Sequence, residues 1–302
     1  APQSKGEEIM ADKKKRVTPY AVLCIVLLIA LAIFFIFPLY WIVTGSVKEK
    51  GDIIIKAGEA IKWFPTTISW DNFARLFKTQ TDFIIKMPLA IRWLFNSVFI
   101  SVFSMLLTCI TASLAGYALA KKRFWGRNFI FSLFVCAMAL PKQVILVPLL
   151  SEMNVLGMTQ TTWGSLFAVI FPIVGWPFGV FMMKQFSESI PNEILEAARI
   201  DGAGELRTFF SVAFPLIKPG FGALAIFTFV NSWNEYPLQL VMLTSSEAKT
   251  IALGIAGLQS EMSNDFGLIM AGAALAAVPI IIVFLCFQKY FTQGITMGAV
   301  KG

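Results

Sequence analysis

The segment Ser189–Gly220, SIPNEILEAARIDGAGELRTFFSVAFPLIKPG, is a polar stretch between two long hydrophobic runs. Pro191 suits the first turn of a helix, where a missing N–H leaves no helical hydrogen bond unmade. Apolar residues then recur at helical spacing as far as Ile200, which predicts a short amphipathic helix. Gly202 and Gly204 indicate its end, because glycine adopts a left-handed cap without a steric penalty.

A second helical piece is predicted from Glu205 to Phe214, and Pro215 is expected to end it. The turn between the two pieces is rich in small residues, so the backbone of another protein could approach it closely. Glu196 and Asp201 would present fixed negative charge at such a contact. On the residues alone, a plain amphipathic connector at a membrane face is an equally good interpretation.

The same segment contains Glu196-Ala197-Ala198, then Gly202 after three residues, then Val212-Ala213-Phe214-Pro215 after nine more. This spacing resembles the EAA loop of ATP-binding-cassette importer permeases, E-A-A-x3-G-x9-I-x-L-P, with valine and phenylalanine replacing isoleucine and leucine. The run EAARIDGA is especially similar to the carbohydrate-importer branch of that family. The resemblance implies a coupling helix that docks into a cleft on a cytoplasmic ATPase, through Glu196, Ala197, Ala198, Arg199, Asp201, Gly202, Ala203 and Pro215.

The composition agrees with a membrane protein. The chain has 302 residues, of which 57% are hydrophobic and only 14% charged, too apolar for an ordinary soluble domain. Its net charge of +7 comes from residues beside hydrophobic runs, so membrane orientation explains it better than nucleic-acid binding. The four cysteines lie in apolar runs and the chain has no histidine, which argues against disulfides, zinc and His-based catalysis.

We therefore expect an all-α membrane protein with six transmembrane helices and a cytoplasmic coupling helix between spans four and five. The spans are expected at Tyr20–Val43, Leu94–Ala120, Phe129–Leu150, Trp163–Met183, a fifth that starts after Pro219 and resumes at Leu238–Leu243, and Phe266–Phe287. Lysine and arginine gather in the N-terminal tail, 121–127 and 184–218, whereas the two shorter outward loops carry one each, Lys142 and Lys249. Both termini are therefore predicted to be cytoplasmic.

These expectations divide the chain into four parts. Residues 1–9 read as an expression remnant ahead of a native start at Met10, and residues 10–19 as a cytoplasmic basic tail. Residues 20–292 form the predicted six-helix permease domain, with the coupling loop at 189–220. Residues 293–302 form the predicted cytoplasmic C-terminal tail, which resembles that of the carbohydrate branch.

Several spans carry features that predict their shape. Hydroxyl and small residues follow one face of the second span, at Ser97, Ser101, Ser104, Thr108, Thr111 and Ala115. Such a stripe favours close helix packing, with a polar pore lining as the alternative. Proline at 141 and 148 predicts that the outer end of the third span is bent or ends early. Gly175, Pro177 and Gly179 predict a bend in the fourth.

The run NSWNEYP, residues 231–237, interrupts the fifth span with polar groups. A carboxylate and two amides are costly inside a bilayer unless they face water or partners. Aromatic rings can stack on sugar rings while amides meet hydroxyls, which makes the run a candidate substrate path formed by Asn231, Trp233, Asn234, Glu235 and Tyr236. An interfacial aromatic belt is the alternative, and the two interpretations stay open.

The absence of several sequence motifs narrows the range of possible functions. It has no G-x4-G-K-[ST] phosphate loop, no metal-ligand cluster and no nucleophile–base pair, so we expect a non-enzymatic chain that binds no cofactor. A secondary transporter is one alternative function, and it would need several ionisable groups along its spans. An importer of a non-carbohydrate solute is a further alternative.

The resemblance implies a permease subunit of an ATP-driven, binding-protein-dependent sugar importer in a bacterial cytoplasmic membrane, forming half of the translocation pathway for an oligosaccharide or polysaccharide fragment. It also implies a second homologous permease, two cytoplasmic ATPase subunits that hold ATP and magnesium, an extracytoplasmic solute-binding protein and surrounding lipid. No nucleic-acid partner is expected.

Overall fold

The computed structural model describes residues 18–53, 60–78, 87–261 and 265–299, so the predicted remnant and most of the basic tail lie outside the described residues. Helices dominate the described part. In chain order they are α1 (Pro19–Ser46), α2 (Lys50–Ile53), α3 (Asp71–Leu76), α4 (Leu89–Lys121), α5 (Arg127–Met138), η1 (Lys142–Ile145), α6 (Leu146–Val155), η2 (Met158–Gln160), α7 (Thr162–Val174), α8 (Pro177–Glu188), α9 (Asn192–Ile200), α10 (Glu205–Thr208), the π-helix η3 (Phe209–Ala213), α11 (Phe214–Trp233), α12 (Tyr236–Met242), α13 (Ile251–Glu261) and α14 (Phe266–Ala299).

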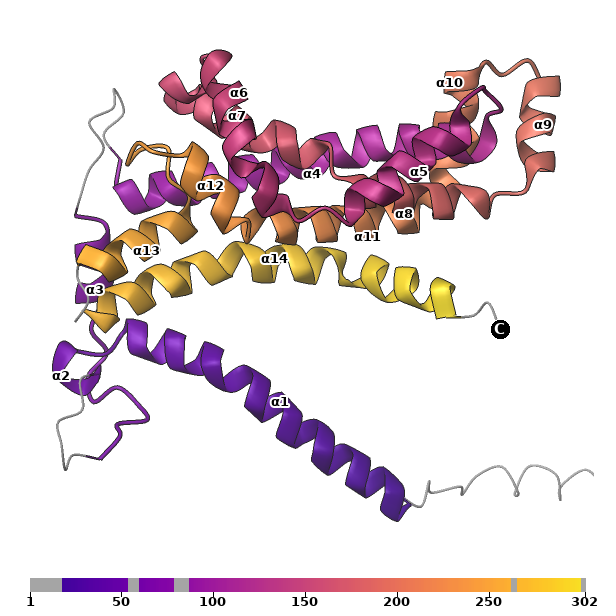
Figure 1. The fold of residues 1–302 in the computed structure, drawn as a ribbon. Coiled ribbons are helices and arrows are strands. Elements are labelled where there is room, and N and C mark those ends of the chain that lie inside the picture. Colours follow the sequence, from indigo (N-terminus) through magenta and orange to yellow (C-terminus); the bar gives the residue numbers. More distant parts are fainter. Residues whose placement is uncertain (1–17, 54–59, 79–86, 262–264, 300–302) are drawn as a thin grey trace, which may run out of the picture.

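The long helices run side by side along one axis (Figure 1). Helix α4 packs against α8 and α11, and α11 packs in turn against α14. Helices α9 and α10 lie at one end of the bundle, and α2, α3 and α13 lie at the other. Helix α1 contacts α14 near the C-terminal end of α1, and toward its N-terminus α1 diverges from the bundle. Nearly all of the apolar side chains of α1 are therefore exposed.

The fold confirms the predicted all-α membrane class. Four helices are long and apolar enough to cross a membrane, at Pro19–Ser46, Leu89–Lys121, Glu205–Trp233 and Phe266–Gln288. Two bent pairs bring the total to six if each pair forms one span, namely α5 with η1–α6, bent by 97°, and α7 with α8, bent by 43°. The bends fall next to Pro141 and at Gly175–Pro177, where the sequence predicts them.

The fifth span differs from the prediction. It begins at Glu205 and not after Pro219, which lies inside α11. Pro215 does not end the second helical piece either, because α10 continues through η3 directly into α11. Pro215 falls in the first turn of α11, where an N–H is not required, and the π-turn before it relaxes the regular hydrogen-bond ladder.

The last helix is also longer than predicted. Helix α14 extends to Ala299, so the predicted tail 293–302 begins within a helix, and residues 300–302 lie outside the described residues.

The polar stripe of α4 is a packing surface over most of its length. Ser97, Ser101, Ser104 and Thr108 are all buried, and the Ser97 hydroxyl accepts a hydrogen bond from the Ile251 amide at 2.9 Å. Thr111 is exposed instead, and its hydroxyl donates back to the Leu107 carbonyl at 2.8 Å. The packing interpretation is therefore correct from Ser97 to Thr108, because those side chains are covered by neighbouring helices.

Helices α4 and α8 approach so closely that glycine is needed between them. A Cβ atom on Gly116 would lie 2.6 Å from the Lys184 amide nitrogen, closer than real Cβ contacts. A Cβ on Gly179 would lie 3.2 Å from the Ala112 methyl group. Small residues thus set the α4–α8 distance, as expected where helices pack without a strong hydrophobic drive between them.

The end opposite α9 carries a compact polar network of lysines in the segment that joins α1 to α3. The buried Lys48 side chain donates to the Lys62 carbonyl at 2.5 Å, and its amine lies 4.4 Å from the centre of the Trp41 ring. The Lys62 amine in turn contacts Asp52 at 2.6 Å. Because these cations are paired or buried within the segment, they are compatible with an outward location.

This network predicts acid sensitivity. Hydrogen bonds from Lys62 and from the Thr66 amide and hydroxyl hold the pKa of Asp52 at about 2, below its ordinary 3.8. A folded-state pKa below the unfolded value stabilises the fold above pH 3.8, and that contribution is lost as pH falls toward 2. We expect cleavage of the segment 44–78 by pepsin, measured relative to an unfolded substrate at the same pH, to become faster as pH falls from 5 to 2.

The matched variant is Asp52→Asn, which cannot titrate. Pepsin should cut this variant faster than the wild type at pH 5, and the difference should shrink by pH 2. Equal cleavage of both proteins at pH 5 would show that the Asp52 carboxylate does not stabilise the segment.

Candidate functional site

The end of the bundle that carries α9 is built as the sequence predicts. Pro191 caps α9, and Gly202 follows it in the left-handed conformation, at φ 79°. The Ala203 amide donates to the Ala198 carbonyl and the Gly202 amide to the Arg199 carbonyl, both at 3.0 Å. This pair of bonds is the Schellman termination, which satisfies the last carbonyls of the helix and requires a residue that tolerates positive φ. Gly204 is not left-handed and instead precedes α10.

Two lysines at the end of α4 fasten α9 and α10 to the bundle. The Lys121 amine donates to the Ile190 carbonyl at 2.6 Å and to the Asn192 side chain at 3.0 Å. The neighbouring Lys122 forms an ion pair with Glu205, whose carboxylate also lies 3.5 Å from Arg199. The turn between α8 and α9 and the start of α10 are therefore held by the same end of α4.

Apolar packing complements these polar contacts. Leu195 is the one fully buried residue of α9, and it belongs to a core cluster that includes Tyr117 of α4 and Phe209 of η3. The rings of Tyr117 and Phe209 lie 5.1 Å apart. A displacement of α9 would thus be transmitted to α4 and α11 through a packed core.

The opposite side of α9 faces outward. Five of the predicted coupling residues lie together on α9 and the following turn and are exposed, namely Glu196, Ala197, Arg199, Asp201 and Gly202, and Ala198 is half-buried among them. Ala203 is half-buried beside them, whereas Pro215 lies apart, on α11. Ile200 is 87% exposed and Leu206 is 69% exposed, which gives this end a small apolar surface ringed by charge.

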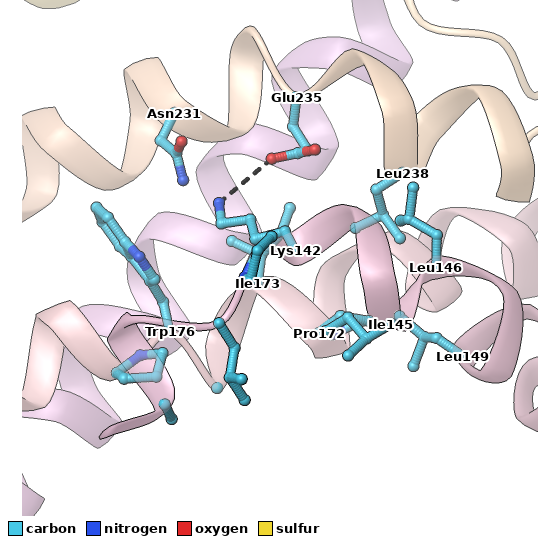
Figure 2. Close-up of a pocket in the computed structure, with 15 residues that line it drawn as sticks. Lys142, Ile145, Leu146, Leu149, Pro172, Ile173, Trp176, Asn231, Glu235 and Leu238 are labelled. Carbon is cyan, nitrogen blue, oxygen red and sulfur yellow. Dashed lines mark hydrogen bonds and ion pairs between the residues drawn. The ribbon is translucent and has the colours of Figure 1, made fainter. Parts of the chain in front are cut away.

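A cavity of about 250 Å³ lies between the two bent regions of the bundle (Figure 2). Its wall is formed where α5 gives way to η1, where α7 gives way to α8, and by α11 and α12. The lining residues are Ala137, Leu140, Pro141, Lys142, Ile145, Leu146, Leu149, Pro172, Ile173, Gly175, Trp176, Pro177, Asn231, Glu235 and Leu238. Three breaks between helices, α5–η1, α7–α8 and α11–α12, thus contribute residues to the wall of the cavity.

One ion pair crosses the cavity. The Lys142 amine lies 3.4 Å from a carboxylate oxygen of Glu235, and 5.7 Å from the centre of the Trp176 ring. In Figure 2 the Lys142, Glu235 and Asn231 side chains meet near Trp176, while Leu146, Leu149 and Leu238 lie toward the other end. The cavity therefore has a polar, aromatic end and an apolar end.

The five predicted path residues do not all reach this cavity. Asn231 and Glu235 line it. Trp233 is buried on another face of α11, stacked on Phe229 with ring centres 5.7 Å apart. Asn234 is exposed, and its amide donates to the Val230 carbonyl at 2.9 Å. Tyr236 is 39% exposed and does not line the cavity.

Sequence reasoning missed two residues of this site. Lys142 is predicted in an outward loop but lies in η1, between α5 and α6, and faces Glu235. Trp176 precedes Pro177 at the bend between α7 and α8, and it supplies the aromatic ring of the cavity. A lone lysine next to a proline inside an otherwise apolar span is the signal that could have identified Lys142, since such a charge needs a partner.

Metal chemistry has no support in the described part of the chain. No group of three or more His, Cys, Asp or Glu side chains is placed there so that it could hold an ion.

Comparison with known proteins adds independent findings. Residues 111–297 match the family model described as binding-protein-dependent transport system inner membrane component. The chain is 35% identical over 272 residues to the arabinooligosaccharides transport system permease protein AraQ of Bacillus subtilis, covering 90% of this chain and 92% of that protein. It is 36% identical over 270 residues to the melibiose/raffinose/stachyose import permease protein MelC of Bacillus subtilis, covering 88% and 91%.

A third relative is the diacetylchitobiose uptake system permease protein DasC of Streptomyces coelicolor, 30% identical over 276 residues and covering 91% of this chain and 95% of that protein. Among solved structures, a chain of a bacterial ABC transporter that imports the acidic polysaccharide alginate aligns with a TM-score of 0.74 at 22% identity, covering 93% of this chain and 98% of that one. At 22% identity, this structural similarity supports the fold alone.

Proposed function

The chain belongs to the family of binding-protein-dependent transport system inner membrane components, and on this premise we propose that it is a membrane-spanning permease subunit of an ATP-driven sugar importer. The observation that carries the proposal is that three relatives, each matched over about nine-tenths of both chains, are named as permeases for saccharides. The chain itself would be non-enzymatic and would form half of the translocation pathway.

Coupling to ATP hydrolysis is assigned to α9 and the turn that follows it. The exposed side of α9 presents small residues, charge and the apolar Ile200, a combination suited to a cleft on another protein. Lys121, Lys122 and Leu195 fasten the helix to α4 and its core cluster. We therefore infer that α9 acts as a rigid lever, since a docked ATPase that moves α9 would move α4 and α11 with it.

The complex would require further subunits. A second homologous permease would complete the path, two cytoplasmic ATPase subunits would hold ATP and magnesium, and an extracytoplasmic binding protein would deliver the sugar. One solved relative, with a TM-score of 0.59 at 16% identity over 87% of this chain, is an alginate transporter in complex with a pentasaccharide-bound periplasmic protein.

The proposed topology has six spans, with each bent helix pair crossing once. The start of α1 and the end of α14 lie toward the end of the bundle that carries α9 (Figure 1). If α9 docks on a cytoplasmic ATPase, both termini are cytoplasmic, as the charge distribution also predicts.

The substrate path is assigned to the cavity, because Asn231 and Glu235 place polar groups there between broken spans. Polar groups at membrane depth are favoured where they line a water-filled or ligand-filled space. An importer for a non-carbohydrate solute remains the second candidate, and the names of the relatives favour the sugar.

The test is uptake by the complete importer, reconstituted from this chain and its partner subunits in lipid vesicles. Three labelled probes follow from the relatives: arabinotriose, raffinose and diacetylchitobiose. We expect ATP-dependent accumulation of at least one probe when its binding protein is present. Accumulation of none of them, by a complex whose ATPase responds to its loaded binding protein, would contradict the carbohydrate assignment.

A further inference from the structure

We infer that the cavity beside Trp176 is a subsite for one uncharged sugar ring, which stacks on Trp176 and bridges the Lys142 amine and the Glu235 carboxylate. The inference rests on the proposed function and specifies its substrate class. It also assigns Lys142 and Trp176, which lie at the α5–η1 and α7–α8 breaks, as residues that contact the substrate.

The charges of the wall balance. Lys142 and Glu235 are the only ionisable side chains among the lining residues, and they carry opposite charges. A neutral saccharide entering this space meets no net charge that would have to be compensated. An acidic saccharide would bring a charge into a largely apolar cavity whose own charges are already paired, and burying a charge without a partner is costly. The wall therefore favours uncharged sugars.

The Lys142–Glu235 ion pair is longer than two other lysine–carboxylate pairs of the chain. Lys62 and Asp52 lie 2.6 Å apart, and Lys184 and Glu188 lie 2.5 Å apart, whereas Lys142 and Glu235 are separated by 3.4 Å. A lysine amine has three donors and a carboxylate has several acceptor positions, so both groups can bind further partners. A sugar hydroxyl can accept from the amine while another donates to the carboxylate.

Trp176 supplies the apolar side of such a site. Its ring is half-buried at the start of α8 and lies at the same end of the cavity as the Lys142 amine and the Asn231 amide (Figure 2). The C–H face of a sugar ring matches an indole surface, while its edge carries hydroxyls toward polar groups. The arrangement of one flat aromatic face with three polar side chains nearby suits a pyranose or furanose ring.

The size of the cavity limits what it holds. About 250 Å³ is below the roughly 300–1,000 Å³ typical of pockets for drug-sized ligands. One ring therefore fits better than a whole oligosaccharide, and longer substrates would occupy this site one unit at a time, with neighbouring units lying outside the cavity.

Charge variants test the pair. In the reconstituted importer, Lys142→Gln or Glu235→Gln alone leaves one unpaired charge in the wall, and we expect uptake of the transported probe to fall by about tenfold. The double variant Lys142→Gln/Glu235→Gln removes both charge-assisted contacts to the sugar, so its uptake should be at least as low as that of either single variant. Lys249→Gln, which changes a lysine outside the cavity, is the matched control and should not alter uptake.

Aromatic variants test the stacking surface. Trp176→Ala should lower uptake by about fivefold to tenfold, whereas Trp176→Phe, which keeps a flat ring, should stay within about twofold. In every variant, assembly with the ATPases and hydrolysis stimulated by the loaded binding protein should be retained, so that fewer sugars move per ATP.

Each possible result of these experiments leads to a different conclusion. If the double variant recovers wild-type uptake, or if stimulated hydrolysis falls together with uptake, the pair has a structural role and the subsite is wrong. Unchanged uptake in Trp176→Ala contradicts it as well. If the wild-type complex imports none of the three probes, the carbohydrate function fails, and the subsite fails with it.

Discussion

Replacing Ala197 with tryptophan should abolish ATP-driven uptake while leaving the membrane domain folded. Ala197 is exposed and lies outside the core cluster of Leu195, so we expect the contacts of Leu195 to be preserved. A protein surface packed closely against α9 has no room for the added ring. We expect at least about a tenfold loss of ATPase subunits from the purified complex, since bulky changes at the centre of an interface disrupt it.

The matched control is Ala60→Trp, which adds the same ring to an exposed alanine in the segment at the opposite end of the bundle. It should retain the ATPases. Ala197→Trp is a sharper test than Gly202→Leu, because the positive φ of Gly202 would strain any other side chain and mix a folding defect with a docking defect. Full retention of the ATPases and of uptake in Ala197→Trp would exclude α9 as the docking helix.

Features with local causes were the ones that the sequence predicted well. Helix α9 and its left-handed stop at Gly202 follow from residues within one turn of each other. The bend at Gly175–Pro177 has a similarly local origin, because proline removes a backbone donor and glycine lowers the cost of bending. The first, second and last spans needed only length and hydrophobicity.

Helix boundaries near proline were less predictable. Pro215 and Pro219 read as breakers, yet both are accommodated in α11, because the π-turn Phe209–Ala213 shifts the helix so that Pro215 falls in its first turn. Such a turn has no signature in the local hydrophobic pattern. The start of the fifth span could therefore not be located from the sequence.

The cavity depended on contacts between distant parts of the chain. Lys142 and Glu235 are separated by 93 residues, and they lie at the α5–η1 break and between α11 and α12 respectively. Trp233 and Trp176 are equally plausible stacking residues by type, and the burial of Trp233 against Phe229 depends on which face of α11 meets its neighbours. Only the three-dimensional arrangement distinguishes them.

We expect this chain to move sugar only when ATPases act on it, and the source of energy for uptake tests this directly. Few ionisable residues fall within the candidate spans, and the one charged pair that lines the cavity is self-neutralised. Proton or sodium coupling would normally require several such groups.

The measurement compares two sets of vesicles containing this chain, its partner permease and the loaded binding protein, one set with the ATPase subunits and one without. ATP added to the first set should drive accumulation of the transported saccharide, and a proton or sodium gradient across the second should drive none. Gradient-driven accumulation in vesicles that lack the ATPases would contradict the account and identify a secondary transporter.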